Sequence, residues 1–180
     1  MQADPSASAL LRYFAGLAEF TFEARLGVVD PPLVDYVAEL LTRFVHSDAV
    51  FSIRNPRGRR LAGVADMVAE ANARVGEARR EAYRQIGDFT LFWTGVYPEA
   101  LKRLQDPTAK DHLVKYSAEG KRSYYVASTI PSAADAPDAV VLQRLSTQFD
   151  LCAYGLGEVR REWERREGDS MMPLIVLGDL

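Results

Sequence analysis

Residues 87–101 have the sequence GDFTLFWTGVYPEAL, in which apolar side chains surround nearly the whole circumference of a helix. A helix without a polar face is typical of the centre of a helical protein. Gly87 and Asp88 together predict a helix break followed by a new N-cap. Pro98 cannot donate a hydrogen bond to the preceding turn, so we expect a bend between Gly95 and Pro98. The stretch therefore predicts a core helix that starts near residue 88.

Three further helices are predicted upstream of this stretch. Aspartate followed by proline, at Asp4–Pro5 and again at Asp30–Pro31, supplies an N-cap and a first helical residue. Apolar side chains then recur at helical spacing to about residue 25 and about residue 46, and Gly27 is expected to end the first helix. From residue 61 to 82 apolar side chains step by three and four, which predicts one long helix.

Two helices are predicted downstream. One spans residues 113–127 and is interrupted by Gly120, where either a kink or a close backbone contact is expected. After an alanine-rich linker at 131–137, Asp138 caps a long final helix that runs to about residue 166. Its apolar seam is expected to face either the helix at 61–82 or another chain, and consists of Val141, Leu145, Phe149, Cys152, Leu156, Val159 and Trp163. The chain is thus predicted to be all-α, with residues 1–168 forming a single-domain bundle of five or six helices.

A turn rich in arginine is predicted between the second and third helices. The residues Asn55-Pro56-Arg57-Gly58 have strong turn chemistry, and the weak alternation before them predicts a short β-ribbon near residues 50–60. Four guanidinium groups within seven residues suit an anion or an acidic partner, or more weakly a nucleic acid or anionic lipid. The alternative is a solvated turn whose arginines pair with nearby acids. The candidate contact residues are Arg54, Arg57, Arg59 and Arg60.

Composition narrows the possible functions. The chain has 180 residues, of which 25 are acidic and 22 basic, giving a net charge of −3. Nucleic acid is an unlikely partner, because such binding usually needs a basic surplus. A single cysteine, Cys152, excludes an internal disulfide. The sequence shows no signal peptide and no membrane span, and we expect a cytoplasmic location.

No catalytic residue, metal site or cofactor is predicted. The two histidines, His46 and His112, have no acidic residue at a ligand-like spacing. Gly120–Lys121 lies in a segment that departs from the phosphate-loop pattern at two positions, and no Gly-x-Ser-x-Gly elbow occurs. Cys152 falls on an apolar seam, which favours a small buried side chain over a nucleophile. The sequence therefore gives little support to an enzymatic function.

Three functional hypotheses remain. The leading one is a non-enzymatic protein–protein interaction or scaffold module that self-associates through its helical seams and an apolar C-terminal tail at 169–180. The tail could dock on this chain or on a partner, and its candidate residues are Leu174, Ile175, Val176 and Leu177. The alternative is a small-molecule-binding or enzymatic bundle with an aromatic pocket, lined by Phe89, Phe92, Trp93, Tyr97, Tyr124 and Tyr125. The third is the arginine-rich contact described above.

The sequences GDFTLFWTGVYPEAL at 87–101 and GKRSYYVAS at 120–128 resemble a family of uncharacterised bacterial proteins. The resemblance implies a bacterial, cytoplasmic protein. It implies no activity, cofactor or site residue.

Overall fold

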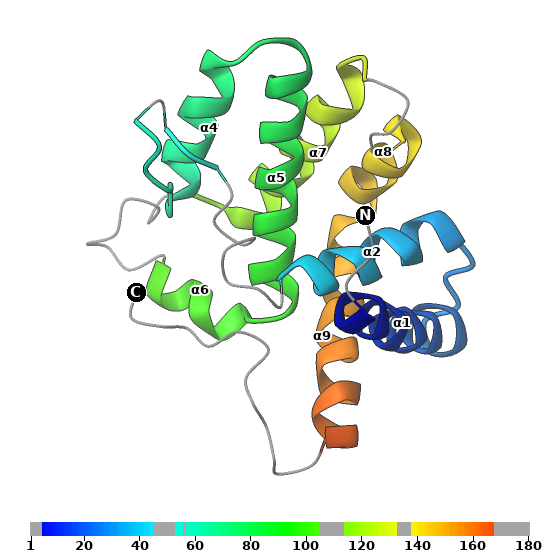
Figure 1. Ribbon diagram of the computed structural model, residues 1–180. Coiled ribbons are helices and arrows are strands. Elements are labelled where there is room, and N and C mark those ends of the chain that lie inside the picture. Colours follow the sequence, from blue (N-terminus) through cyan, green and yellow to red (C-terminus); the bar gives the residue numbers. More distant parts are fainter. Residues whose placement is uncertain (1–4, 45–52, 56, 105–113, 133–137, 168–180) are drawn as a thin grey trace. The chain divides into compact units, whose positions relative to one another are not determined.

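A computed structural model describes residues 5–44, 53–55, 57–104, 114–132 and 138–167. Within these ranges the chain forms eight α-helices and one π-helix, with no β-strand (Figure 1). The prediction of an all-α fold is confirmed, with more helices than the five or six expected. The elements are α1 (Pro5–Glu19), η1 (Phe20–Arg25), α2 (Pro31–Phe44), α4 (Val64–Ala73), α5 (Gly76–Gly95), α6 (Pro98–Leu104), α7 (Tyr116–Thr129), α8 (Ala139–Thr147) and α9 (Phe149–Glu167).

The described residues group into two units, and the boundary between them lies within the continuous helix α9. Unit 1 takes its residues from 1–50 and 154–180, and unit 2 from 51–153. The single-domain organisation predicted for residues 1–168 stays a prediction.

Unit 1 is built on the helical hairpin of α1 and α2. Gly27, with a φ of +68°, allows the reversal between them that the sequence predicts. The last turn of the first helix widens into the π-helix η1, whose Phe22 is fully buried. The Phe22 ring lies so close to Gly155 of α9 that a Cβ atom there would be 2.7 Å from ring carbons. The rings of Phe14 and Trp163 pack edge to face, with their centroids 6.4 Å apart.

Unit 2 is organised around α5, which packs against α4 and α7, while α7 packs in turn against α8 (Figure 1). Helix α5 is buried on nearly every side from Ile86 to Trp93, as its apolar sequence predicts. The expected bend also occurs, because α5 ends at Gly95 and α6 begins at Pro98. Unit 2 thus places residues 86–96 at its centre, whereas residues 98–101 lie nearer the surface.

The predicted helix break at Gly87–Asp88 is wrong. Helix α5 runs continuously through both residues, and the break lies at Arg74–Gly76 instead, where Gly76 has a φ of +55°. Gly87 is needed for a different reason, since a Cβ atom there would lie 2.7 Å from the Tyr124 ring. The single long helix predicted for 61–82 is therefore two helices, and Val75, one of the apolar side chains in that stretch, is 81% exposed.

The final helix is also divided, because α8 ends at Thr147 and α9 begins at Phe149. Its predicted cap is confirmed: Val140 donates its backbone N–H to the Asp138 carboxylate at 2.9 Å. Six of the seven seam residues are buried and Trp163 is half-buried. Helix α8 packs on α7. The α8 part of the seam therefore faces α7 rather than the helix predicted at 61–82.

Gly120 of α7 is a point of close contact, one of the two outcomes expected. A Cβ atom at this position would lie 2.5 Å from Thr90 Oγ1 and closer still to the Phe149 ring.

Across the described residues, no helix is long and apolar enough to cross a membrane.

Candidate functional site

The arginine-rich segment forms a hydrogen-bonded turn, which we call the arginine turn (residues 53–61). Where the structure describes the predicted β-ribbon, at residues 53–55 and 57–60, it has one antiparallel bridge, between Arg54 and Arg60. Gly58 donates its N–H to the Asn55 carbonyl at 2.8 Å and has a φ of +77°, which favours glycine. The Asn55 side-chain Oδ1 accepts the N–H groups of Arg57 and Arg59, each at 3.0 Å. Side-chain and backbone bonds thus close this turn without a paired strand.

The four arginines of the turn are exposed but have different surroundings. Arg54 donates to the Gly58 carbonyl at 3.0 Å, which fastens its guanidinium to the turn. Arg74, which follows the last residue of α4, donates to the Arg54 carbonyl at 2.9 Å. Among the described residues, no acidic group pairs with Arg57 or Arg59. Arg57 and Arg59 therefore present two cations to solvent from a backbone that Asn55 holds in place.

A groove of about 360 Å³ lies between the arginine turn and α4. Its residues combine a cation, two carboxylates, an amide and two apolar side chains: Asn55, Arg59, Leu61, Asp66, Ala69 and Glu70. Glu70 also accepts a hydrogen bond from Arg74 at 3.1 Å, which links the groove to the base of the turn. The groove can therefore offer donors and acceptors to the same ligand.

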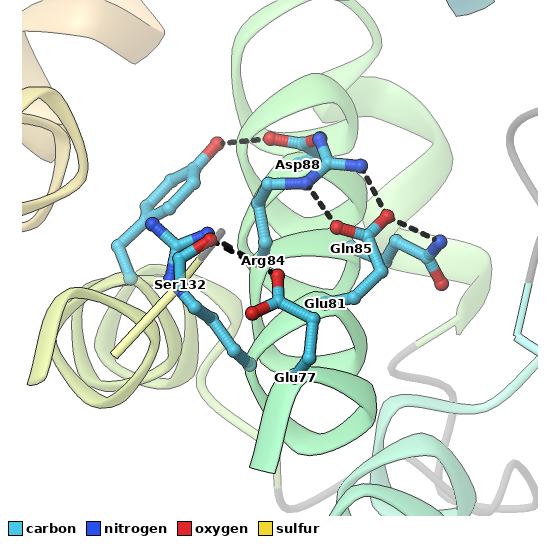
Figure 2. A network of polar contacts seen from close by, with 8 residues as sticks. Glu77, Glu81, Arg84, Gln85, Asp88 and Ser132 are labelled. Atoms are coloured by element: carbon cyan, nitrogen blue, oxygen red, sulfur yellow. Dashed lines mark hydrogen bonds and ion pairs between the residues drawn. The ribbon is translucent and has the colours of Figure 1, made fainter. Parts of the chain in front are cut away.

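A second polar cluster lies in unit 2 along one side of α5 and extends from the buried Asp88 toward the surface (Figure 2). Asp88, only 2% exposed, accepts a hydrogen bond from Arg84 at 2.6 Å and one from the Tyr124 hydroxyl at 2.8 Å. Arg84 also donates to both carboxylate oxygens of Glu81, at 2.7 and 2.5 Å. Gln85 donates to Glu81 at 2.8 Å. One charge-assisted bond, from the Tyr124 hydroxyl to Asp88, therefore joins α7 to α5.

The polar cluster along α5 was not predicted from the sequence. Its signal is present in the spacing of Glu77, Glu81, Arg84 and Asp88, which follow one another by three or four residues on α5. That pattern is normally a solvated helix face, and the assumed helix break at Gly87–Asp88 removed Asp88 from it. Arg80, 1% exposed, belongs to the same side of the helix and lies 3.9 Å from Glu77. Glu81, Arg84, Gln85 and Asp88 bond to one another and Asp88 bonds to Tyr124, so this part of the cluster is a structural tie.

The aromatic residues proposed as a pocket form a packed interior. The ring centroids of Phe92 and Trp93 are 5.8 Å apart, and those of Phe89 and Trp93 are 6.1 Å apart. These are ordinary distances for packed aromatic rings. Tyr97 lies 5.8 Å from Phe92 and is half-buried. Tyr124 is buried on α7, whereas its neighbour Tyr125 is 55% exposed. The structure therefore places four of the six residues in unit 2's interior, with Tyr97 half-buried beside them and Tyr125 at the surface.

Several predicted residues lie outside the described residues: the tail residues Leu174 to Leu177 and both histidines. Cys152 is buried, as its place on the seam predicts. Within the described ranges, no group of three or more His, Cys, Asp or Glu side chains is arranged to hold a metal ion.

Charged side chains of α9 and η1 form a surface cluster around Glu162 in unit 1. Arg166 donates to Glu162 at 2.9 Å, Arg165 donates to the other carboxylate oxygen, and Arg25 lies 3.8 Å away. The hydrogen bond from Arg166, aided by the charges of Arg165 and Arg25, holds the pKa of Glu162 below its ordinary value, although desolvation acts in the opposite direction. Arg165 and Arg166 thus pair with Glu162 within the same helix.

We expect Glu162→Gln to destabilise the protein at neutral pH and to have little effect in acid. Because the folded pKa is lowered, the ionised carboxylate stabilises the fold above the unfolded pKa of about 4.3, and this contribution disappears as the pH falls through the folded pKa. Urea unfolding of both proteins at neutral pH and near pH 3 measures the difference. Glu19→Gln, at an exposed carboxylate, is the control. A difference between wild type and Glu162→Gln that grows toward acid would contradict the assignment.

Comparison with known proteins gives no assignment. No protein-family model, no curated protein and no solved structure matches the chain. The resemblance to bacterial proteins therefore stays a prediction, and function must be inferred from the geometry of the site.

Proposed function

We propose that this chain is a non-enzymatic protein–protein interaction module that self-associates, and that the arginine turn is its contact surface. The observation that carries the proposal is the pair Arg57 and Arg59, two exposed guanidinium groups on a turn fixed by Asn55. A fixed backbone lowers the entropy lost when a partner binds. Arginine is also enriched at protein interfaces. The helical seams no longer support the proposal, because their residues are mostly buried inside the chain.

The chain itself carries carboxylates that suit these cations. Glu19 and Glu23 in α1 and η1, and Asp35 and Glu39 in α2, are exposed and have no ion pair within the described part of the chain. Each pair is spaced by four residues, so its members repel one another by about 0.2–0.5 kcal/mol. A cation from a second copy would relieve that repulsion. A net charge of only −3 also leaves little general repulsion between copies.

A polyanion fits the turn less well than a protein does. Asp66 and Glu70 line the groove beside Arg59, and both would repel a phosphate chain laid across it. A protein surface of mixed charge can avoid that repulsion. These carboxylates therefore favour a protein partner over nucleic acid or anionic lipid.

Sedimentation velocity over a range of protein concentrations tests the proposal. We expect reversible self-association that weakens as salt rises, because exposed charges are screened over about 10 Å at 0.1 M salt. The double variant Arg57→Ala/Arg59→Ala should raise the dissociation constant by about tenfold or more, or about 1.4 kcal/mol. Arg122→Ala is the matched control, since Arg122 is an exposed arginine already paired with Glu119 at 3.1 Å.

Two results would overturn the proposal. One is a wild-type chain that remains monomeric at every concentration and salt. The other is self-association that the double variant leaves unchanged, which would place the interface elsewhere.

A further inference from the structure

We propose that the groove beside the arginine turn is a binding site for a small zwitterion, a molecule that carries a carboxylate and an ammonium group. This inference does not depend on self-association, because the groove is formed within one chain. Its volume of about 360 Å³ lies at the lower end of the range of about 300–1,000 Å³ for small-molecule sites.

The arginine turn forms the part of the site that would bind the carboxylate of the ligand. Arg59 has no acidic partner among the residues that the structure describes, so its guanidinium can donate two parallel hydrogen bonds to a carboxylate. The Asn55 side chain uses its oxygen to hold the turn. Asn55 lines the groove, and its Nδ2 group remains as a second donor for the ligand.

Helix α4 forms the part of the site that would bind the ammonium group of the ligand. Asp66 and Glu70 are four residues apart, so they lie on one face of the helix, and both line the groove. An ionised carboxylate has about four acceptor positions, so Glu70 can keep its bond to Arg74 and still accept an ammonium hydrogen. Leu61 and Ala69 supply apolar contacts for a hydrocarbon chain between the two charges.

The arrangement also excludes simpler ligands. An anion alone would gain from Arg59 but would meet two carboxylates, and a cation alone would gain from those carboxylates but would meet Arg59. Only a ligand with both charges pairs with both sides. A groove rather than an enclosed cavity leaves the ligand partly in water, so affinity is expected to be weak, on the order of millimolar.

Three ligands of equal chain length test this site: 6-aminohexanoate, hexanoate and hexylamine. We expect 6-aminohexanoate to shift the NMR signals of the Asn55 side-chain amide and of the Gly58 and Arg59 backbone amides. Each single-charge ligand should bind about tenfold more weakly or worse. Arg59→Ala should remove the preference for 6-aminohexanoate over hexylamine. Asp66→Asn should reduce its preference over hexanoate, because Glu70 remains.

Arg57→Ala separates this site from the proposed function. Arg57 does not line the groove, so this variant should bind 6-aminohexanoate as the wild type does. Equal binding of hexanoate would show a plain anion site and overturn the inference. It would also be overturned if none of the three ligands shifted any signal of the turn at concentrations up to about 20 mM, well above the expected range. Neither outcome bears on self-association.

Discussion

Replacing Asp88 with alanine should lower the free energy of unfolding by about 3–5 kcal/mol, the range for breaking a buried ion pair by removing one partner. Asp88 is 2% exposed, so its carboxylate has little contact with water. It holds Arg84, 11% exposed, at 2.6 Å and the Tyr124 hydroxyl at 2.8 Å. Alanine would leave an interior guanidinium with one carboxylate fewer and a buried hydroxyl without its acceptor. Chemical unfolding followed by circular dichroism measures the loss.

Two milder variants divide this loss into its parts. Tyr124→Phe removes only the hydroxyl bond across α5 and α7, and we expect it to cost about 1–3 kcal/mol. Asp88→Asn keeps the shape of the side chain but removes its charge, so its cost should lie between those of the other two variants. Gln143→Ala, on an exposed position of α8, is the control and should be close to neutral. An Asp88→Ala cost below about 1 kcal/mol would mean that Arg84 is satisfied by Glu81 alone.

Helix starts could be predicted because their signals are local. Pro31 and Asp138 set the starts of α2 and α8 through their own backbone and side-chain chemistry, and Gly27 ends the first helix by the same kind of local rule. The π-helical turn η1 was not predicted, because a stripe of apolar residues has nearly the same spacing in an α-helix and in one π turn. Local chemistry therefore gives the ends of helices more readily than their internal geometry.

The two glycines Gly76 and Gly87 show where local chemistry is insufficient. Gly76 is needed for a positive φ at a turn, whereas Gly87 lies inside a helix because the Tyr124 ring leaves no room for a side chain. In the sequence both are glycines within an otherwise helical pattern. Tyr124 is 37 positions after Gly87, so only the tertiary structure distinguishes the two roles.

The candidate site was predictable in part for the same reason. The four arginines and the turn chemistry of the segment Asn55–Gly58 are visible in seven residues of sequence, so the arginine turn could be predicted. The groove could not, because Asp66 and Glu70 belong to a helix predicted with a different extent. Whether Arg57 and Arg59 find acidic partners depends on which carboxylates the fold brings close. The interior position of Asp88 likewise depends on α7.

Replacing Gly120 with alanine should cost about 2–3 kcal/mol of unfolding free energy, as overpacking of a dense interior does. Gly120 is buried in α7, and an added Cβ atom would lie 2.5 Å from Thr90 Oγ1 and closer to the Phe149 ring. Neither neighbour can move freely. Thr90 donates to the carbonyls of α5 at 2.9 Å, and Phe149 is fully buried at the start of α9. Alanine's higher helix propensity, worth about 1 kcal/mol, offsets only part of the clash.

Gly16→Ala supplies the matched control, because Gly16 lies in α1 with nothing within 4 Å of an added Cβ atom. Here only helix propensity acts, so the substitution should stabilise the protein by about 0.5–1 kcal/mol. Gly155→Ala, against the Phe22 ring in unit 1, should behave like Gly120→Ala. The same chemical change is thus expected to have opposite signs at positions that differ only in their neighbours. If Gly120→Ala stabilised the protein as Gly16→Ala does, the close packing of α7 against Thr90 and Phe149 would be refuted, since no other feature of Gly120 opposes a methyl group.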